Sequence, residues 1–297
     1  MNLVLDLGNS RCKWALADAG QEPKRRDAQG CASVAGGTTP GATDAQGCAS
    51  VAGGTTPGAT DAQGCARAAA GLVQGGALAY GEDFARALDS SFNSLLRPQC
   101  VAAVSVAAAG HLQTLAQWTQ RRWGLELQPV VACAAQLGVT NTYKDPARLG
   151  ADRWAALIAA RARLPGAVCV VDCGTALTID ALDGNGVYRG GVILPGLALM
   201  RDALLRTQGV REVLGDAESP LAQSTADGVA AGTLFGLTGA IDRILDEQAT
   251  RLGDTPHILI TGGDAQTLLA RLRHAVQHTP DLVLEGVACI ARAGDST

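Results

Sequence analysis

The segment Leu3-Val4-Leu5-Asp6-Leu7-Gly8-Asn9-Ser10 and the segment Val168-Cys169-Val170-Val171-Asp172-Cys173-Gly174-Thr175 share one pattern. In each, an apolar run typical of a buried strand ends in an aspartate, a glycine turn and a hydroxyl residue. Glycine lets the backbone approach a ligand closely. The turn's N–H groups and hydroxyls can hold phosphate oxygens, and the carboxylate can bind a cation. Two copies therefore predict two lobes that grip the phosphate tail of a nucleotide.

Composition limits the classes of protein to which the chain can belong. Its 297 residues are enough for two domains, and 47% are hydrophobic but only 3% aromatic, which predicts a core of Ala, Val and Leu. The net charge of −4 and the lack of a long basic block disfavour a nucleic-acid or anionic-membrane partner. The apolar runs look too short to span a membrane, and the first strand begins at once without a leader. We therefore expect a cytoplasmic protein with no membrane partner.

The nine cysteines do not form a metal-binding pattern. Three of them (Cys31, Cys48 and Cys65) are copies within a repeat, and no C-x-x-C pair exists, so a zinc site is not expected. Cys169 and Cys173 are four residues apart on a predicted strand and face the same side. We interpret them as small core residues in a reducing compartment.

A tandem duplication interrupts the first half of the chain. Residues 27–43 recur without change as residues 44–60, and a partial third copy covers residues 61–66. The unit is small, polar and rich in Gly, Thr and Pro, so it cannot bury enough apolar surface to offset its ordering entropy. We expect an insert of about 27–66 in a surface loop, mobile and dispensable for chemistry, because loop-closure entropy grows slowly with length.

Around this insert the pattern is α/β. In the first half we expect strands over 3–7, 13–17, 77–80, 100–106 and 125–131, helices over 84–96, 111–123 and 151–164, and an irregular segment over 137–149. In the second half we expect strands over 168–171, 176–181, 187–193 and 257–261, helices over 197–205, 225–248 and 268–274, and a closing segment over 282–290. Both halves open with strand, acidic glycine turn and strand, which predicts a duplicated fold.

A third glycine turn, Thr261-Gly262-Gly263-Asp264, follows a later apolar strand, whereas a P-loop and a G-x-G-x-x-G helix start are absent from the sequence. The three turns together resemble the actin, hexokinase and Hsp70 superfamily. The resemblance implies two ribonuclease-H-like lobes around a central nucleotide cleft, with the diglycine against adenosine. We place the N-terminal lobe at 1–147 and the C-terminal lobe, which the resemblance also makes the dimerisation lobe, at 148–297.

A fourth element narrows the resemblance. The segment 143–154 (YKDPARLGADRW) carries Gly-x-Asp-Arg at the start of a predicted helix. Together with Asp172 to Asp180 and the Gly190-Gly191 and Pro195-Gly196 pairs, it resembles type III pantothenate kinase, a family that includes Bvg accessory factor proteins. Two departures are Ser10, where the family more often has threonine, and the repeat insert.

The resemblance implies ATP-dependent phosphorylation of pantothenate to 4′-phosphopantothenate, the first step of coenzyme A synthesis, by a homodimer. Asp152 matches the general base of the family. Asp6 would bind the Mg²⁺ that accompanies the phosphates, and Asp172 matches the family's monovalent cation site for K⁺ or NH₄⁺. The implied ATP-binding residues are Asp6, Leu7, Gly8, Asn9, Ser10, Arg11, Cys12, Lys13 and Thr175. The implied pantothenate-binding residues are Tyr143, Gly150, Ala151, Asp152, Arg153 and Thr225, with the arginine suited to a carboxylate.

Several residues also have simpler interpretations. Asp152 and Arg153 fit a helix N-terminal acid followed by a surface arginine, and Tyr143 fits a packed loop aromatic. Ser224 or Thr225 fits an N-cap. At the level of function, a kinase for another small alcohol and a nucleotide-binding regulatory protein are the alternatives.

Overall fold

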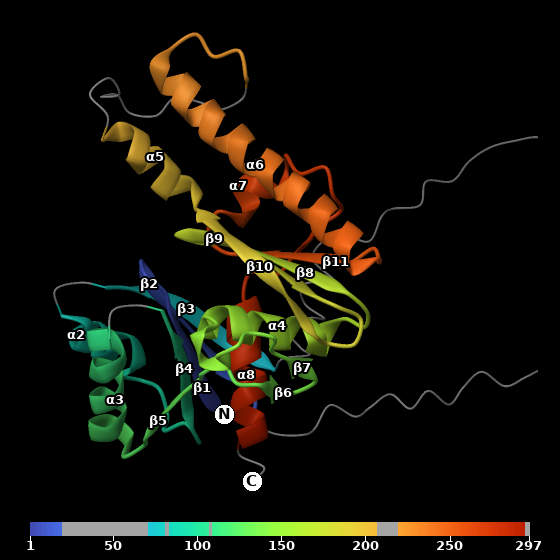
Figure 1. Ribbon diagram of the computed structural model, residues 1–297. Helices are drawn as coiled ribbons and strands as arrows, with labels where there is room; N and C mark the ends of the chain where they lie inside the picture. The colour runs from blue at the N-terminus through green and yellow to red at the C-terminus, as the bar shows by residue number, and fades with distance from the viewer. Residues whose placement is uncertain (20–70, 81–82, 107–108, 207–218, 295–297) are drawn as a thin grey trace, which may run out of the picture.

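The computed structural model describes residues 1–19, 71–80, 83–106, 109–206 and 219–294. Within them the chain forms two five-stranded sheets with helices packed on their faces (Figure 1). The repeat insert predicted at about 27–66 lies outside the described residues, so its expected mobility and dispensability remain predictions.

The first sheet has the strand order β3-β2-β1-β4-β5. Its strands are β1 (Asn2–Leu7), β2 (Arg11–Ala17), β3 (Leu72–Ala79), β4 (Val101–Ser105) and β5 (Leu127–Pro129). β1 and β2 form an antiparallel hairpin in which Leu7 pairs with Cys12, and β3 continues this antiparallel pattern on β2. β4 pairs with β1 in parallel, and β5 pairs with β4 in parallel.

The second sheet repeats this topology with the order β10-β9-β8-β11-β12. Its strands are β8 (Val168–Cys173), β9 (Ala176–Leu182), β10 (Tyr188–Pro195), β11 (His257–Thr261) and β12 (Gln277–His278). β8, β9 and β10 are antiparallel neighbours, and β11 and β12 add in parallel. The matching order and direction confirm the predicted duplication and the two-lobed α/β fold.

Helices form layers on both sides of each sheet. The helices are α2 (Phe84–Phe92), α3 (Ala109–Trp123), α4 (Ala151–Arg163), α5 (Leu197–Leu205), α6 (Thr225–Leu252), α7 (Ala265–Leu269) and α8 (Leu282–Gly294). α2 and α3 cover the outer face of the first sheet, and α6 and α7 cover the outer face of the second. α4 and α8 lie between the two sheets, as Figure 1 shows.

The period of two along a strand explains this layering. Leu3, Leu5 and Leu7 join the cluster under α2 and α3, whereas Val4 points into the central layer with α4 and α8. In β8 the same alternation sends Cys169 and Cys173 into the cluster under α6, where both are fully buried as predicted.

The central layer depends on small residues. The inward surface of α4 is rich in alanine, and Gly286 of α8 lies so close that a Cβ atom there would overlap the carbonyl oxygen of Ala155. A buried ion pair between Arg163 and Glu285 also joins the two helices, with Arg163 Nε 2.5 Å from Glu285 Oε2. Because α8 packs against β1 and β4, the end of the chain returns to the first lobe. The boundaries 1–147 and 148–297 therefore stay a prediction.

Several element boundaries differ from those predicted. The helix expected over 268–274 is wrong in position, because α7 begins directly after Asp264 and ends at Leu269. The backbone N–H of Arg273 donates to the buried carboxylate of Asp242 in α6, so this stretch turns back toward β12. The segment over 137–149, expected to be irregular, contains β7 (Val139–Thr140), paired with β6 (Ala135–Gln136), and the short helix η1 (Pro146–Arg148).

The remaining boundary differences are shifts. β3 begins at Leu72 and not at Ala77, α2 ends at Phe92, and α6 continues to Leu252. By length and composition alone, α6 is long and apolar enough to cross a membrane, contrary to the expectation that no run was long enough. Half of its apolar window is buried inside the protein, which is the pattern of a core helix and does not indicate a membrane protein.

Candidate active site

The three aspartates singled out in the sequence lie around one cavity. Asp6, Asp152 and Asp172 all line a cleft of about 490 Å³ between the two lobes, together with both glycine turns and the diglycine turn. The carboxylates come from β1, from the first turn of α4 and from β8. Residues separated by more than 160 positions thus meet because the two sheets face each other across α4 and α8.

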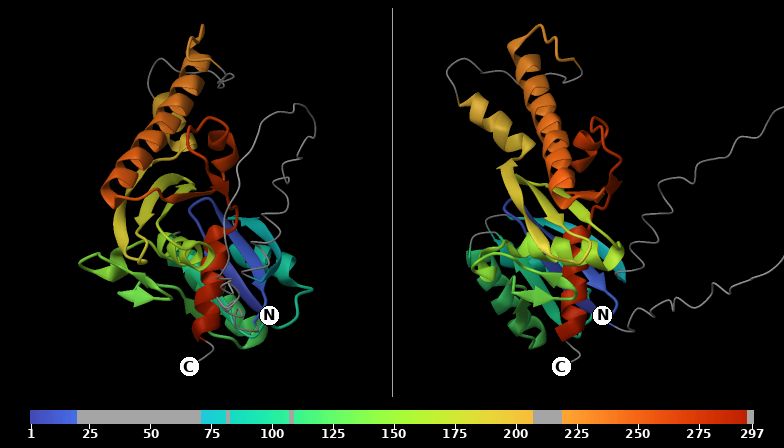
Figure 2. Two further views of the ribbon diagram at one scale, coloured as in Figure 1. Left: turned by 90° about the vertical axis from the view of Figure 1, so that its right-hand side faces the viewer. Right: turned by 45° about the vertical axis from the view of Figure 1, so that its right-hand side comes forward.

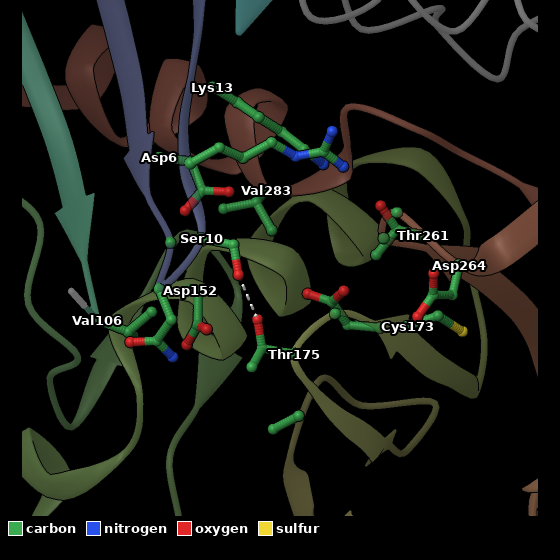
Figure 3. Close-up of a pocket in the computed structure, with 18 of the residues that line it drawn as sticks. Asp6, Ser10, Lys13, Val106, Asp152, Cys173, Thr175, Thr261, Asp264 and Val283 are labelled. Carbon is green, nitrogen blue, oxygen red and sulfur yellow. Dashed lines mark hydrogen bonds between the residues drawn. The ribbon is translucent and has the colours of Figure 1, made fainter. Parts of the chain in front are cut away.

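The two phosphate-type turns also touch directly across the cleft. The hydroxyl oxygens of Ser10 and Thr175 are 3.0 Å apart and form a hydrogen bond (Figure 3). Ser10 belongs to the turn between β1 and β2, and Thr175 to the equivalent turn between β8 and β9. Both hydroxyls are exposed to the cavity, so an incoming phosphate can take over their hydrogen-bonding capacity.

Electrostatics at the base of the cleft favour binding of a cation. Burial raises the pKa of Asp6 to about 6, although the nearby Lys13 ammonium opposes this rise. Burial raises the pKa of Asp172 to about 7, and the negative charges of Asp152 and Asp6 contribute to that rise. Carboxylates that are hard to ionise together become good ligands once a positive charge enters.

Asp152 owes its position to the start of α4. Gly150 is the N-cap of this helix, and the Asp152 carboxylate accepts a hydrogen bond of 2.7 Å from the backbone N–H of Arg153. A Cβ atom at residue 150 would lie 2.6 Å from Asp152 Oδ1, so glycine keeps the carboxylate's space free. Burial raises the Asp152 pKa above its ordinary value, and the Arg153 N–H and guanidinium oppose that rise.

The carboxylates of the cleft suit a metal ion that is bound partly by the protein and partly by the phosphate groups of a substrate. Among the residues that the structure describes, no three His, Cys, Asp or Glu side chains converge to enclose a metal ion. Mg²⁺ usually binds through one or two carboxylates together with phosphate oxygens and water. Asp6 at the cavity wall matches that mode for Mg²⁺, and Asp172 lies beside it as the predicted ligand of a second, monovalent cation.

The other glycine motifs shape the same cleft by allowing close backbone contacts. Gly262 has φ +97°, and a Cβ atom there would overlap the backbone of Cys173. A Cβ atom at Gly263 would lie 2.7 Å from the guanidinium of Arg11. Gly196 donates its N–H to the Thr175 carbonyl oxygen at 2.9 Å and packs on that turn. Gly262 therefore permits close backbone packing, and Gly263 leaves space for the Arg11 side chain.

The predicted ATP-binding residues divide into two groups. Those that line the cavity are Asp6, Gly8, Asn9, Ser10, Arg11, Lys13 and Thr175. The side chains of Leu7 and Cys12 do not line it, because both are fully buried in the core under α2 and α3. Their backbone positions in β1 and β2 support the turn that holds the others.

The predicted pantothenate-binding residues are more widely spread around the cavity than the predicted ATP-binding residues. Of them only Asp152 lines the cavity. Arg153 is a buried residue, contrary to the alternative of a surface arginine, and its guanidinium contacts Asp180, Tyr188 and the hydroxyl of Tyr143. Gly150 and Ala151 form the turn beside it.

Thr225 lies elsewhere. It lines a separate apolar groove between α5 and α6, and Ser224, not Thr225, caps α6 by accepting the Asp227 N–H at 3.1 Å. α5 separates this groove from the cavity: Ala198, Leu199 and Asp202 line the cavity, whereas Met200 and Leu204 line the groove.

Some residues of the site were not assigned a role from the sequence. Asp180 is buried at the centre of β9, with an isoleucine before it and an alanine after it. A charged residue inside an otherwise apolar strand was the available signal. Asp202, Asp264 and Asp281 also line the cavity, on segments whose approach depends on tertiary structure.

The comparison with solved structures defines the class of protein. A Baf family protein from Campylobacter jejuni matches with a TM-score of 0.53 at 18% identity, over 99% of this chain and 100% of that one. The activator of 2-hydroxyisocaproyl-CoA dehydratase from Clostridium difficile, solved with bound ADPNP, matches with a TM-score of 0.50 at 10% identity, over 99% and 95%. The chain therefore shares the fold of these two proteins.

Sequence relatives define the family within that class. The family model for type III pantothenate kinase matches residues 58–247. The type III pantothenate kinase of Alkalilimnicola ehrlichii is 40% identical over 73% of this chain and 88% of its own length. That of Halorhodospira halophila is 36% identical over 97% and 96%. The chain belongs to the type III pantothenate kinase family, and its activity is the ATP-dependent phosphorylation of pantothenate.

Proposed function

We propose that Asp152 is the general base of this reaction. The observation that carries the proposal is that three carboxylates from distant segments (Asp6, Asp152 and Asp172) line one cavity with both phosphate-type turns. The pantothenate hydroxyl is a weak nucleophile until its proton is removed. A raised pKa suits the task, because a base works best when its pKa lies near the working pH.

The nucleotide occupies the side of the cavity formed by the two turns. Ser10 and Thr175 bind phosphate oxygens with their hydroxyls, while Arg11 and Lys13 neutralise phosphate charge. Asp6 would hold the Mg²⁺ that accompanies the phosphates. Mg²⁺ would stabilise the charge on the transferred phosphoryl group, since phosphoryl transfer depends mainly on positioning and charge neutralisation. The dehydratase activator, which shares this fold and was solved with bound ADPNP, supports the binding of a nucleotide by the fold.

Asp172 is the proposed ligand of a monovalent cation, K⁺ or NH₄⁺. Its pKa of about 7 lies further above the ordinary value than that of Asp6, which is about 6. A single positive charge beside Asp172 would offset the repulsion from Asp6 and Asp152. The carboxylate would then be ionised at neutral pH.

The chain works as a homodimer in the cytoplasm under this proposal. Apolar side chains are exposed on α5, α6 and the neighbouring β10: Leu204, Leu205, Phe235 and Ile193. Thr225 lies in the groove on the far side of α5 from the cavity, so its predicted contact with pantothenate requires the substrate of a partner subunit. In the proposed dimer Thr225 can therefore contact pantothenate bound to the partner subunit, which it cannot do within a single chain.

The substitution Asp152→Asn tests the base. We expect kcat to fall by about 10²–10⁴-fold in K⁺ buffer, because the shape is kept and only the proton acceptor is lost. ATP binding, measured by calorimetry with a non-hydrolysable analogue, should change little, since Asp152 is not among the phosphate-contacting residues. Turnover close to that of the unchanged enzyme would refute the assignment.

A further inference from the structure

Arg153 is held by a buried polar network that the reaction as described does not use. Asp180 of β9 accepts from Arg153 Nε at 2.9 Å and also from Nη2. Tyr188 of β10 accepts from Arg153 Nη2 and donates to Asp180 Oδ1, each at 2.8 Å. All three side chains are at least nine-tenths buried. A buried charge pair persists only with good geometry and satisfied hydrogen bonds, and this pair has both.

The surroundings fix this network in one conformation. Gly191 of β10 lies opposite Asp180, and a Cβ atom there would overlap Asp180 Oδ1 and lie 2.8 Å from Arg153 Nη2. The third guanidinium nitrogen, Nη1, contacts the Tyr143 hydroxyl at a long 3.5 Å. Nε and Nη2 are therefore committed to Asp180 and Tyr188, and Nη1 is the nitrogen with donor capacity left for a ligand.

The network also links two parts of the site. Arg153 follows Asp152 in the first turn of α4, and Asp180 lies in β9, the strand that leaves the Asp172–Thr175 turn. The ion pair thus ties the helix that carries the proposed base to the hairpin that carries the phosphate turn.

We propose that Asp180 is a positioning residue for pantothenate: it orients Arg153 so that Nη1, beside the Tyr143 hydroxyl, binds the substrate carboxylate. This rests on the proposed contact between Arg153 and pantothenate. An arginine that is already held in its binding conformation loses less conformational entropy when the ligand arrives. In this role Asp180 acts through Arg153, so its effect on the KM for pantothenate must disappear when Arg153 is absent.

The test is a double-mutant cycle with Arg153→Gln, Asp180→Asn and the two combined, measured by steady-state kinetics. We expect Asp180→Asn to raise the KM for pantothenate about 10-fold or more, as for loss of a charged hydrogen bond, and to leave the KM for ATP within about twofold. The combined variant should be no worse than Arg153→Gln alone.

Two further variants guard against a failure to fold. Tyr188→Phe keeps the ring and the ion pair and removes one hydroxyl, so a rise of about threefold in pantothenate KM is expected. Asp183→Asn removes a carboxylate that pairs with Arg189 at 2.8 Å in the same hairpin, and it should leave both KM values unchanged.

The outcomes separate the two ideas. An unchanged pantothenate KM in Arg153→Gln would refute the contact with pantothenate, and the positioning role with it. A large effect of Arg153→Gln together with an additive loss from Asp180→Asn would refute the role of Asp180 alone. An equal rise in both KM values for Asp180→Asn would also overturn the proposal, because a merely structural residue behaves in that way.

Discussion

At the scale of single residues, the cleft combines acids that are hard to ionise together. The carboxylate of Asp172 lies near those of Asp152 and Asp6, whose charges raise its pKa, and the Lys13 ammonium only partly offsets them. The monovalent cation proposed for Asp172 would add the missing positive charge. Without a bound cation, repulsion among these carboxylates lowers the free energy of unfolding. A bound cation raises it again, because a ligand that binds only the folded state stabilises that state.

The pH dependence of the ligand-free protein follows from Asp172. Its pKa is 3.8 unperturbed and about 7 in the folded protein, so between about pH 4 and pH 7 the unfolded chain releases a proton that the folded chain keeps. Stability is therefore lost as the pH rises through this window. We expect Asp172→Asn to be more stable than the unchanged protein at pH 8, by up to a few kcal/mol, roughly 1.4 kcal/mol for each pKa unit. The difference should vanish near pH 4 in urea unfolding without Mg²⁺, K⁺ or nucleotide.

Asp183 provides a control of opposite sign. Burial would raise its pKa, but hydrogen bonds from the N–H groups of Val187 and Asn185 and from Arg189 lower it below the ordinary value. Its contribution is present at neutral pH and is lost as the pH falls through the folded pKa. Asp183→Asn should therefore lower stability at pH 8, and a gain there would contradict the assignment of both acids.

At the scale of elements, the central layer of α4 and α8 decides how closely the two sheets approach. Gly286 touches the backbone of Ala155, and the alanines of α4 leave little space between the helices. Side chains in a packed interior cannot yield freely, so even one extra methyl group is felt there.

We predict that Gly286→Ala destabilises the protein by about 1–3 kcal/mol, because the added methyl group must push α8 away from α4. Gly110→Ala is the matched control. Gly110 is exposed in α3. Among the described residues outside its chain neighbours and its own helix backbone, no atom lies within 4 Å of the place that an added methyl group would take, so the change should be neutral or slightly stabilising. Urea unfolding at one pH measures both, and equal stabilities of the two variants would rule out the packing account.

At the scale of the whole molecule, α5 and the N-terminal part of α6 extend beyond the second sheet in both views of Figure 2, whereas the rest of α6 packs on that sheet. Their exposed apolar side chains and the groove containing Thr225 lie on this projection. A second copy of the chain would cover these side chains and bring Thr225 toward a second active site.

For the proposed homodimer we predict a mass of about 60 kDa by light scattering, twice the 30.2 kDa of one chain. Phe235→Glu places a charge on α6 in the proposed interface and should yield a 30.2 kDa monomer with a raised KM for pantothenate. Leu96→Glu puts the same charge on an exposed leucine of the first lobe and should leave the dimer intact. A monomeric unchanged protein would exclude the homodimer.

Much of this architecture could be predicted from local patterns. The apolar strands, the acidic glycine turns and their repetition in the second half indicated two lobes, because strand periodicity and turn chemistry are written into neighbouring residues. Short motifs also identified the three aspartates of the cleft: the glycine turns indicated Asp6 and Asp172, and the Gly-x-Asp-Arg motif indicated Asp152. Helix boundaries were less accurate: α7 was misplaced because the Arg273 backbone pairs with Asp242 of α6, a contact between residues 31 positions apart.

By itself the sequence determined the two-lobed α/β plan, the three aspartates and the family resemblance, since these depend on short motifs in fixed order. Only the tertiary structure decided that Leu7 and Cys12 face the core, that Thr225 lies across α5 from the cavity, and that Arg153 is bound by Asp180 and Tyr188. The physical reason is that burial, pKa and hydrogen-bond partners are set by the packing of two sheets against one helical layer, which brings together residues that no local pattern relates.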